Sequence, residues 1–448
     1  MKRLVYLLLR AVSSLDRWLR DRLTPAGWLA LGAAAAAGAA GLDTTKNLSY
    51  QAATLLGALL ALAYGASLLF RARVAVSREL PRYATAGEPI SYAVTVANLG
   101  RRPLEGVHLR EMPADARPTY DAWRRAREPG EERRNWFDRN MGYFRWRWLI
   151  ERRSPEPPAD TALPALAPGA RRTLRLSLTP RRRGRIALTG LALGRTDPLG
   201  LVRGLARLPL EGRCIALPRR YRLPRLALPG RRRHQRGGVT LSAAVGDSEE
   251  FLSLREYRPG DPLQHIHWKS FARVGRPIVK EFQDEFFERH ALVLDTGARG
   301  GEDAAFEDAV AVAASFVATL DTQECLLDLL FVGGEVRHYV AGRGRLHADP
   351  MLEVLAGVGA SAPQAFPALA RAVLESRAQL ASCILVLVGW DEPRRQLARS
   401  LATAGIEVRA ILVCANEDAP RDAPPWLAVV HPGAIEAGLA DLERKVLR

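Results

Sequence analysis

One short segment in the middle of the chain carries most of the side chains that could perform chemistry. His265 and His267 stand one residue apart in it, and Asp261 precedes them. A histidine oriented by a carboxylate can act as the general base of a hydrolase. Ser253 and Ser270 are the neighbouring hydroxyls, but neither lies in the Gly-x-Ser-x-Gly turn that presents a nucleophile. Two histidines could instead bind a metal ion, although positions i and i+2 of a strand point to opposite faces.

A structural interpretation of the same segment requires fewer assumptions. Residues 259–262 read Pro-Gly-Asp-Pro, which is typical of a tight turn. We expect the charged side chains around this turn to form ion pairs that lock the linker between two domains. We expect Trp268 to be the buried anchor of this linker, with its indole N–H hydrogen-bonded. The charged residues are Arg255, Glu256, Asp261 and Arg273. A partner-binding face is the alternative for this segment.

Composition limits the class of protein. The chain has 448 residues, which predicts two or three domains. A hydrophobic fraction of 48% excludes a wholly disordered chain. The net charge of +17 suits anionic partners such as a lipid headgroup layer or an acidic protein surface. The arginine-rich stretch 218–236 contains few aromatic side chains, so we expect it to tether to anionic lipid or to be solvated rather than to bind nucleic acid.

The four cysteines indicate core packing rather than covalent or metal cross-links. None of them forms a Cys-x-x-Cys pair, which excludes a zinc ribbon, and four in this length exclude a disulfide scaffold. Cys325, Cys383 and Cys414 lie in apolar runs, and we expect them to be small core residues.

Two uncharged stretches near the start predict a transmembrane hairpin. Residues 26–42 and 50–70 would be about 25 and 31 Å long as helices, close to the hydrocarbon thickness of a bilayer. Arginine and lysine crowd the outer flanks, and the loop between the stretches is nearly neutral. The positive-inside rule then places the basic N-terminus (residues 1–25) and everything after the hairpin in the cytoplasm. A cleaved signal peptide is the alternative, but a second apolar stretch argues against it.

The body of the chain divides into a β part and an α/β part. Residues 71–217 show short alternating runs between turns, which predict an immunoglobulin-like antiparallel β-sandwich. An insertion at 113–160, rich in tryptophan and arginine, would be either a surface for lipid or an acidic partner, or a solvated and loosely packed excursion. Residues 218–289 form a basic linker and the histidine segment. Residues 290–448 alternate between buried strands and amphipathic helices, which predicts a sheet covered on both faces.

The histidine segment closely resembles the bacterial domain-of-unknown-function family 58. The matching residues are Arg255, Glu256, Tyr257, Gly260, Asp261, Ile266, His267, Trp268, Lys269, Ala272 and Arg273. Two stretches before it, 181–190 and 195–204, also agree with the family. The resemblance implies a bacterial inner-membrane protein whose α/β half is a von Willebrand factor A-like domain. It implies no chemical activity, but a role as adaptor or scaffold for a MoxR-type AAA+ ATPase in chaperone-like assembly or envelope work. Transglutaminase-like and other von Willebrand A-type membrane proteins are the further partners it implies.

The resemblance also raises the question of a metal. Von Willebrand A domains often bind Mg²⁺ through an Asp-x-Ser-x-Ser loop, and the corresponding loop here begins at Asp295. Gly297 offers no side-chain oxygen, and Arg299 would place a cation beside the ion. Ser361 and Asp391 could complete only a poor site. We therefore expect no metal or other cofactor, with Asp295 capping the loop amides or pairing with Arg299.

These observations lead to one expected function and two alternatives. The expected function is a non-enzymatic adaptor whose docking surface is the edge marked by Asp295, Arg299 and Asp391, since ligands of α/β sheets bind beyond the carboxyl ends of the strands. The first alternative is a Mg²⁺-dependent ligand-binding module. The second is a hydrolase built on His265 and His267.

Overall fold

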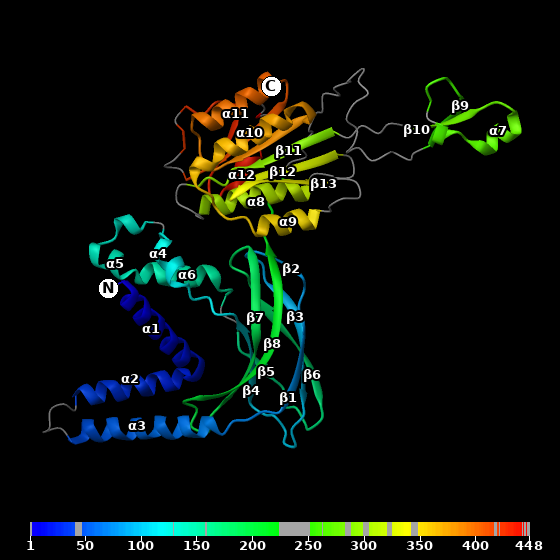
Figure 1. Cartoon of the computed structure of the whole chain (residues 1–448). Coiled ribbons are helices and arrows are strands. Elements are labelled where there is room, and N and C mark those ends of the chain that lie inside the picture. The colour runs from blue at the N-terminus through cyan, green and yellow to red at the C-terminus, as the bar shows by residue number, and fades with distance from the viewer. Residues whose placement is uncertain are drawn as a thin grey trace.

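The computed structural model describes residues 2–40, 47–128, 130–156, 159–223, 251–261, 263–282, 288–298, 304–319, 325–341, 348–415, 419–420, 422–440, 442 and 445. The chain is a multi-domain protein of mixed α and β content (Figure 1). N-terminal helices are followed by a two-sheet β domain with a helical insertion, a small ββα unit and a C-terminal α/β domain.

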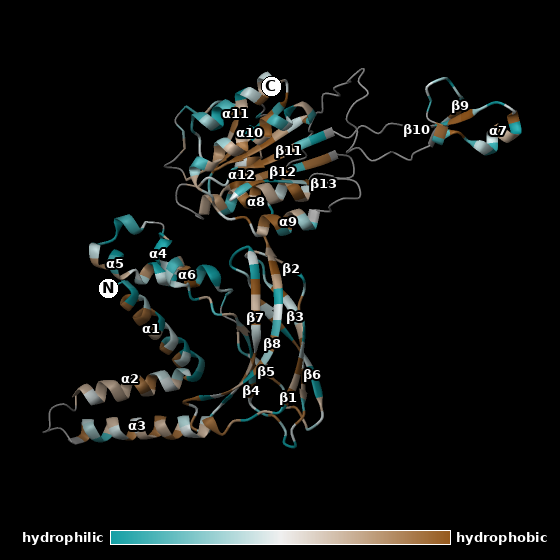
Figure 2. Ribbon diagram, in the orientation of Figure 1, coloured by the Kyte–Doolittle hydropathy of each residue, from teal (hydrophilic) through white to brown (hydrophobic). Residues whose placement is uncertain are grey.

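The chain begins with three helices, namely α1 (Lys2–Arg22), α2 (Pro25–Ala40) and α3 (Asn47–Leu68). Within the described residues, α3 is the helix long and apolar enough to cross a membrane, over Leu48–Leu68. The first expected span, 26–42, coincides with α2, which is apolar but only 16 residues long. Figure 2 shows apolar residues along both α2 and α3, whereas the helices of the insertion are largely hydrophilic. The basic N-terminus expected at 1–25 is itself almost entirely helical.

The β domain is a sandwich of two sheets. The smaller sheet has the order β1-β3-β6 and the larger has the order β2-β8-β7-β4-β5. The strands are β1 (Val74–Glu79), β2 (Tyr83–Thr85), β3 (Ile90–Asn98), β4 (Val107–Pro113), β5 (Thr161–Leu163), β6 (Arg171–Leu178), β7 (Gly184–Thr196) and β8 (Arg203–Leu217). Val94 and Leu176 of the smaller sheet pack against Leu109, Leu191 and Leu193 of the larger one. Alternate residues of each strand thus supply the shared core, as the sequence pattern predicts.

A charged pair is buried inside this sandwich. The guanidinium of Arg78, on β1, binds the carboxylate of Glu111, on β4, and the two side chains are only 2% and 1% exposed. The Tyr92 hydroxyl donates a hydrogen bond to Glu111 over 2.7 Å, and Arg78 also donates to the Leu210 carbonyl over 2.7 Å. Burial raises the pKa of Glu111, against the opposing effects of Tyr92 and Arg78. The pair is therefore buried, and each of its members has a further hydrogen-bond partner.

The long β7–β8 hairpin reaches both ends of the β domain. Its turn, residues 197–202, meets the junction between α1 and α2, where the Thr24 hydroxyl donates to the Gly200 carbonyl over 2.6 Å. At the other end, Arg183 binds Glu307 of the C-terminal domain and donates to the Leu355 carbonyl over 3.1 Å. The hairpin therefore contacts both the N-terminal helices and the C-terminal domain.

The insertion forms a helical cap on α1. Its elements are α4 (Tyr120–Arg125), η1 (Glu131–Arg133), α5 (Trp136–Met141) and α6 (Tyr143–Arg153). Trp123 and Trp146 are buried against Tyr6 and Leu9 of α1. The expectation of a loosely packed, solvated insertion is wrong, because the amphipathic helix α1 provides an apolar partner for these indoles.

The family motif lies in a small ββα unit. It comprises β9 (Phe251–Glu256), η2 (Leu263–His265), α7 (Trp268–Val274) and β10 (Ile278–Phe282), with β9 and β10 antiparallel. Figure 1 shows this unit standing apart from the other domains. The described residues of this unit do not form the packed joint between domains that the sequence predicts.

The C-terminal domain is a six-stranded sheet with helices on both faces. The strand order is β13-β12-β11-β14-β15-β16, in which β13 is antiparallel and the other five strands are parallel. The strands are β11 (Glu288–Leu294), β12 (Cys325–Gly333), β13 (Glu335–Ala341), β14 (Ser382–Leu387), β15 (Glu407–Val413) and β16 (Leu427–Val430).

Two hydrophobic cores flank this sheet. One face packs against α8 (Ala304–Thr319), α9 (Ala348–Ala356) and α12 (Ile435–Leu439). The other packs against α10 (Phe366–Ser376) and α11 (Glu392–Thr403). Short 3₁₀ turns η3 (Pro363–Ala365) and η4 (Arg377–Gln379) flank α10. Cys383 and Cys414 are buried core residues, as expected, and the side chain of Cys325 lies outside the described part.

Candidate functional site

The carboxyl edge of the C-terminal sheet has the geometry of a ligand site. The strand order reverses between β11 and β14, and α/β sheets bind ligands beyond the carboxyl ends of strands at such a reversal. Asp295 follows β11 directly. Asp391 follows β14 and caps the N-terminus of α11, accepting from the Arg394 N–H over 3.4 Å. The two carboxylates that the sequence singles out therefore do lie at one edge.

A buried arginine lies between these two carboxylates. The Nε and Nη2 atoms of Arg394 donate to the two oxygens of Asp295 over 2.7 and 3.0 Å. Its Nη1 donates to Asp391 over 2.6 Å. The guanidinium carbon lies 4.4 Å from the centre of the Phe366 ring, and the side chain is 3% exposed. The guanidinium of Arg394 is thus a fixed, buried cation. It bridges the carboxylates of Asp295 and Asp391 at the point where the strand order reverses.

The surroundings of Arg394 and Asp391 favour the charged form of each side chain. Burial opposes the charge of Arg394, but hydrogen bonds and attraction from Asp295 and Asp391 outweigh it and raise the pKa of Arg394. Burial acts against the charge of Asp391, and its bonds to Arg394 overcome this and lower the pKa of Asp391. Arg394 and Asp391 therefore keep their charges at neutral pH.

The remaining predicted ligands are engaged in the loop itself. The Gly297 N–H donates to Asp295 over 2.9 Å, which confirms that Asp295 caps the loop amides. The Ser361 hydroxyl contacts the Thr296 hydroxyl at 2.8 Å. Arg299 lies outside the described residues, so its pairing with Asp295 stays a prediction. Among the residues that the structure describes, no group of three or more His, Cys, Asp or Glu side chains could hold a metal ion.

Asp295 is not available as a docking residue. Its side chain is 1% exposed beneath Arg394, so the expectation that it contacts a partner is wrong. Asp391 keeps a side-chain exposure of 38%. Sequence reasoning also missed Arg394. A basic side chain in the first turn of a helix opposes the helix dipole, and this unfavourable position was the available sign of a buried acidic partner.

The charged residues of the ββα unit pair partly as expected. Arg255 binds Asp261 through two hydrogen bonds of 2.7 and 2.9 Å, and the Arg258 N–H donates to Asp261 over 2.8 Å. Hydrogen bonds from Arg255, then from the Arg258 backbone, lower the pKa of Asp261 to about 2. Glu256 pairs with Arg276 at 3.0 Å rather than with Arg273.

The histidine segment shows a local contact instead of a catalytic relay. His267 Nδ1 lies 2.7 Å from the Ser270 hydroxyl at the start of α7. Asp261, the carboxylate expected to orient a histidine, is occupied by Arg255. Among the described residues, the three-member arrangement that a hydrolase needs is therefore not assembled around His267. His265 ends η2, and Lys269 is exposed on α7.

Trp268 is not a buried anchor. Its side chain is 63% exposed, and Ile266 and Val279 fill the small interior of the unit instead. The sequence-based expectation is wrong because so small a unit buries too little surface to enclose an indole. Gly260 has a φ of 111°, which explains why the motif has glycine at this turn. Tyr257 fixes the strand end, since its N–H donates to the Pro277 carbonyl over 2.9 Å.

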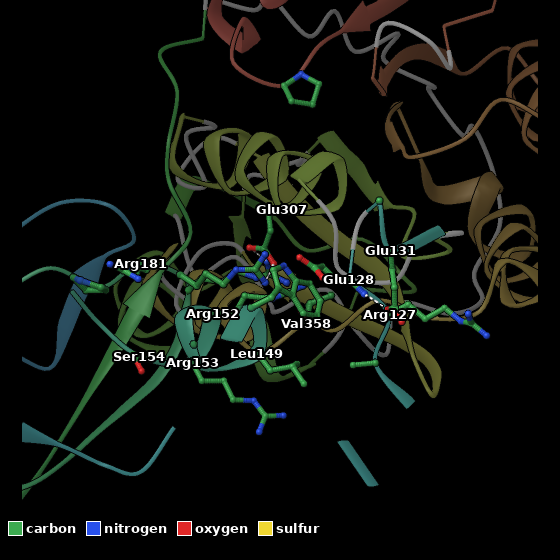
Figure 3. A pocket seen from close by; sticks show the side chains of 18 of the residues that line it. Arg127, Glu128, Glu131, Leu149, Arg152, Arg153, Ser154, Arg181, Glu307 and Val358 are labelled. Atoms are coloured by element: carbon green, nitrogen blue, oxygen red, sulfur yellow. Dashed lines mark hydrogen bonds and ion pairs between the residues drawn. The ribbon is translucent and has the colours of Figure 1, made fainter. Parts of the chain in front are cut away.

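A large cleft opens beside the sheet edge, between the insertion, the end of the β domain and the C-terminal domain (Figure 3). Its volume is about 1560 Å³, above the roughly 300–1,000 Å³ of small-molecule pockets. Ala415 and His431, which follow β15 and β16, belong to its wall. The cleft thus opens at the same edge of the sheet as Asp295 and Asp391, although neither residue lines it.

Arginines dominate the wall of this cleft. Ten arginines and four glutamates line it. Three of the glutamates are neutralised, because Glu128 pairs with Arg134, Glu131 with Arg145, and Glu307 with Arg182 and Arg183. Seven of the ten arginines have no acidic partner among the described residues, including Arg125, Arg181 and Arg185. The cleft therefore carries excess positive charge.

Comparison with known proteins supports the resemblance seen in the motif. Residues 253–420 match the family model "Protein of unknown function DUF58". The matched region includes most of the ββα unit and the whole Asp295–Arg394–Asp391 cluster, and it excludes the insertion. The chain is also 30% identical over 162 residues to the "Uncharacterized protein YeaD" of Bacillus subtilis (strain 168). That alignment covers 36% of this chain and 39% of the relative, so the chain spans about two fifths of the relative's length.

Among solved structures, two of the CARDB domain of the PF1109 protein of Pyrococcus furiosus are similar. One is a crystal structure in complex with di-metal ions, with a TM-score of 0.18, 12% identity, and coverage of 32% of this chain and 86% of that one. The other is a solution structure with a TM-score of 0.16, 13% identity, and coverage of 31% and 94%. At these scores the likeness supports no inference about this chain.

Proposed function

We propose that this protein is a non-enzymatic adaptor, anchored in a bacterial inner membrane, that binds a MoxR-type AAA+ ATPase. The observation that carries the proposal is Arg394. The position where α/β domains bind ligands or metals is closed here by the protein's own guanidinium, bound to Asp295 and Asp391. Such an edge has the rigidity of a recognition surface, and its described residues leave no open coordination position.

We further propose that the C-terminal domain is von Willebrand factor A-like. Its support is the strand order, with the first strand central, one antiparallel edge strand, and an aspartate at the end of that first strand. The match of residues 253–420 to the family model supports the same assignment. Chaperone-like assembly or envelope work, with transglutaminase-like or other von Willebrand A-type proteins nearby, is the setting that the family resemblance implies.

The Mg²⁺-dependent alternative is opposed by electrostatics. A divalent ion placed about 4 Å from the Arg394 guanidinium would meet a repulsion on the order of 8 kcal/mol at an effective dielectric constant of 20. The two carboxylates that could offset this are already bonded to Arg394. The hydrolase alternative has the contact between His267 and Ser270 in its favour, but this contact joins residues three apart at a helix start.

Metal titration distinguishes the adaptor from the Mg²⁺ module. We expect Mg²⁺ and Mn²⁺ to show no sub-millimolar binding to the full chain in lipid nanodiscs, measured by isothermal titration calorimetry. The reason is that Arg394 already satisfies Asp295. Sub-millimolar binding that Asp295→Ala abolishes would contradict the adaptor proposal and favour the Mg²⁺ module.

The arginine-lined cleft is the docking surface that we propose for an acidic segment of the ATPase. Its size suits a polypeptide better than a small molecule. Nucleic acid is a poorer fit, because Arg152 covers one face of Trp148, an aromatic of the lining, at 4.3 Å, which leaves less of this ring for base stacking. We propose this cleft as the docking site in place of the edge at Asp295 that the sequence predicts. The cleft adjoins that edge.

Membrane anchorage is proposed through α2 and α3. The two helices lie side by side, and α3 has the length and composition of a span. At 1.5 Å per residue α2 is about 24 Å long, somewhat short of the hydrocarbon layer, which a local thinning or flanking side chains can match. The basic flanks favour a cytoplasmic location for both termini.

Co-purification tests the adaptor role and the cleft together. The full chain is co-expressed with its gene neighbours and extracted in mild detergent. We expect a MoxR-type ATPase to co-purify with it. Arg181→Glu combined with Arg185→Glu should weaken the complex by about tenfold or more, equivalent to ~1.4 kcal/mol. Arg171→Glu with Arg172→Glu is the matched control, because these exposed arginines lie on β6 outside the cleft.

The outcomes separate the two parts of this proposal. If no ATPase accompanies the parent chain, the adaptor role is wrong. If the ATPase is retained equally by both double variants, the adaptor role stands and the cleft is not its docking site. A preference for polyphosphate over a poly-glutamate peptide, measured by fluorescence anisotropy, would contradict a polypeptide ligand.

A further inference from the structure

Helix α1 has two faces of opposite character. Leu4, Leu8 and Leu15 fall on one side at helical spacing and are 72%, 51% and 58% exposed. Leu7 and Val12 extend the same exposed face. An uninterrupted row of exposed leucines on a soluble surface is unfavourable, and it marks a surface that is covered in the working protein.

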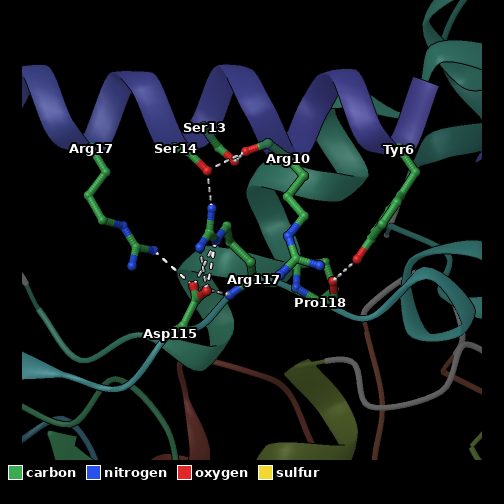
Figure 4. A network of polar contacts seen from close by, with 8 residues as sticks. All are labelled: Tyr6, Arg10, Ser13, Ser14, Arg17, Asp115, Arg117 and Pro118. Carbon is green, nitrogen blue, oxygen red and sulfur yellow. Dashed lines mark hydrogen bonds and ion pairs between the residues drawn. The ribbon is translucent and has the colours of Figure 1, made fainter. Parts of the chain in front are cut away.

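The opposite face of α1 is held by the insertion (Figure 4). The Tyr6 hydroxyl donates to the Pro118 carbonyl over 3.2 Å, and its ring packs 5.5 Å from that of Trp146. Arg17 pairs with Asp115 at 3.2 Å. Arg117 pairs with the same carboxylate at 2.6 Å and also binds the Ser14 hydroxyl. These contacts fix the rotation of α1, so its leucine face cannot turn inward.

The position of α1 in the molecule indicates what covers the leucine face. In Figure 1, α2 and α3 leave on one side of α1, whereas the insertion, most of the β domain and the C-terminal domain lie on the other. A bilayer surface running along α1 would therefore admit α2 and α3 and leave these larger parts outside it. The leucine face, turned away from the insertion, points to the lipid side.

Aromatic and basic side chains also lie where the proposed bilayer surface would meet α1 and α3. Trp18 of α1 packs against Tyr64 of α3 with ring centres 5.8 Å apart, and Arg22 lies over both rings at 5.7 and 5.6 Å. Tryptophan, tyrosine and arginine are the side chains that favour the membrane–water interface. Six basic residues against two acidic ones in α1 also suit anionic headgroups.

We propose that α1 is an interfacial membrane helix, with its leucine face among the upper acyl chains, and that the insertion clamps its polar face. This inference rests on the proposed anchorage by α2 and α3. It assigns the insertion a role as the element that orients α1 on the lipid.

Depth measurement in vesicles tests this arrangement. Single cysteines are introduced at Leu8, Arg10 or Leu62 of the full chain, labelled with an environment-sensitive nitrobenzoxadiazole dye, and reconstituted with phosphatidylcholine, phosphatidylglycerol and brominated lipid. Cys214, Cys383 and Cys414 are buried, and the unsubstituted chain measures any background labelling. We expect several-fold stronger quenching at Leu8→Cys than at Arg10→Cys, which is exposed on the opposite side of α1. Leu62→Cys, on the exposed surface of α3, should be quenched as well.

Each other result has a distinct meaning. Quenching at Leu62→Cys without quenching at Leu8→Cys would overturn the interfacial role of α1 while leaving the anchor intact. No quenching at either position would contradict the anchor itself. Shielding of Leu8→Cys that depends on protein concentration and not on brominated lipid would show that a second copy of the chain covers the leucine face, and would also overturn the proposal.

Discussion

Replacing Arg394 with alanine is expected to lower the free energy of unfolding of the C-terminal domain by about 3–5 kcal/mol. The change leaves the buried Asp295 carboxylate without the two hydrogen bonds that balance its charge. It also leaves a void against Phe366. Hydrogen–deuterium exchange of β11 and β14, followed in the full chain in detergent micelles under native conditions and with added urea, reports this domain separately from the others.

The matched control is Arg399→Ala. Arg399 lies on the same helix, α11, but its side chain is exposed, so its removal should change stability by less than about 0.5 kcal/mol. Arg394→Lys should fall between the two, because an ammonium group keeps the charge but cannot bind both oxygens of Asp295 and Asp391 together. Equal exchange rates in Arg394→Ala and Arg399→Ala would contradict the structural role assigned to the buried cluster.

The second large effect is expected in the β-sandwich, where Arg78→Met should also cost about 3–5 kcal/mol. Methionine fills much of the space, but Glu111 then stays buried with only the Tyr92 hydroxyl as a side-chain partner. Burial raises the pKa of Glu111, and without Arg78 that pKa should rise further. The folded state then binds the proton more tightly than the unfolded state. The loss of stability should therefore be smallest at acid pH and should grow as the pH rises from the ordinary carboxyl value through the raised one.

A double substitution provides the control for this pair. Arg78→Met combined with Glu111→Met removes both charges, and it should be more stable than Arg78→Met alone at neutral pH and lose most of the pH dependence. Urea unfolding of the full chain between pH 5 and pH 8, read by exchange in β3 and β4, compares the variants. A double variant less stable than the single one would show that packing, and not the unpaired carboxylate, dominates at this site.

The parts of the fold that depend on local periodicity were predictable. Alternation in the strands around Val94 and Leu191, and the alternating strands and helices after Ala291, follow from burial of one face or of a whole strand. The tight turn between β12 and β13 likewise depends on local sequence, because Gly334 has a φ of 89°, which glycine adopts without strain. These features need only neighbours in sequence to be inferred, and they positioned Asp295 and Asp391 correctly at one edge.

The features that depend on distant partners were not predictable. Arg394 meets Asp295 across 99 positions of sequence, and its unfavourable place in the first turn of α11 does not say which distant acidic side chain it binds. Trp146 is buried because α1, more than a hundred residues earlier, supplies an apolar surface. Trp268, surrounded by a strong motif, looked like a core residue, but its unit has no core large enough to accept it.

The β7–β8 hairpin has a mechanical consequence. Its strands have 13 and 15 residues, so it forms a strut about 45–50 Å long whose ladder of hydrogen bonds is continuous except for one register shift. One end is bonded to Thr24 at the base of α2, and the other to the C-terminal domain through Arg183. A force applied to the C-terminal domain would be transmitted along this strut to the N-terminal helices. The hairpin therefore couples the two ends of the molecule mechanically.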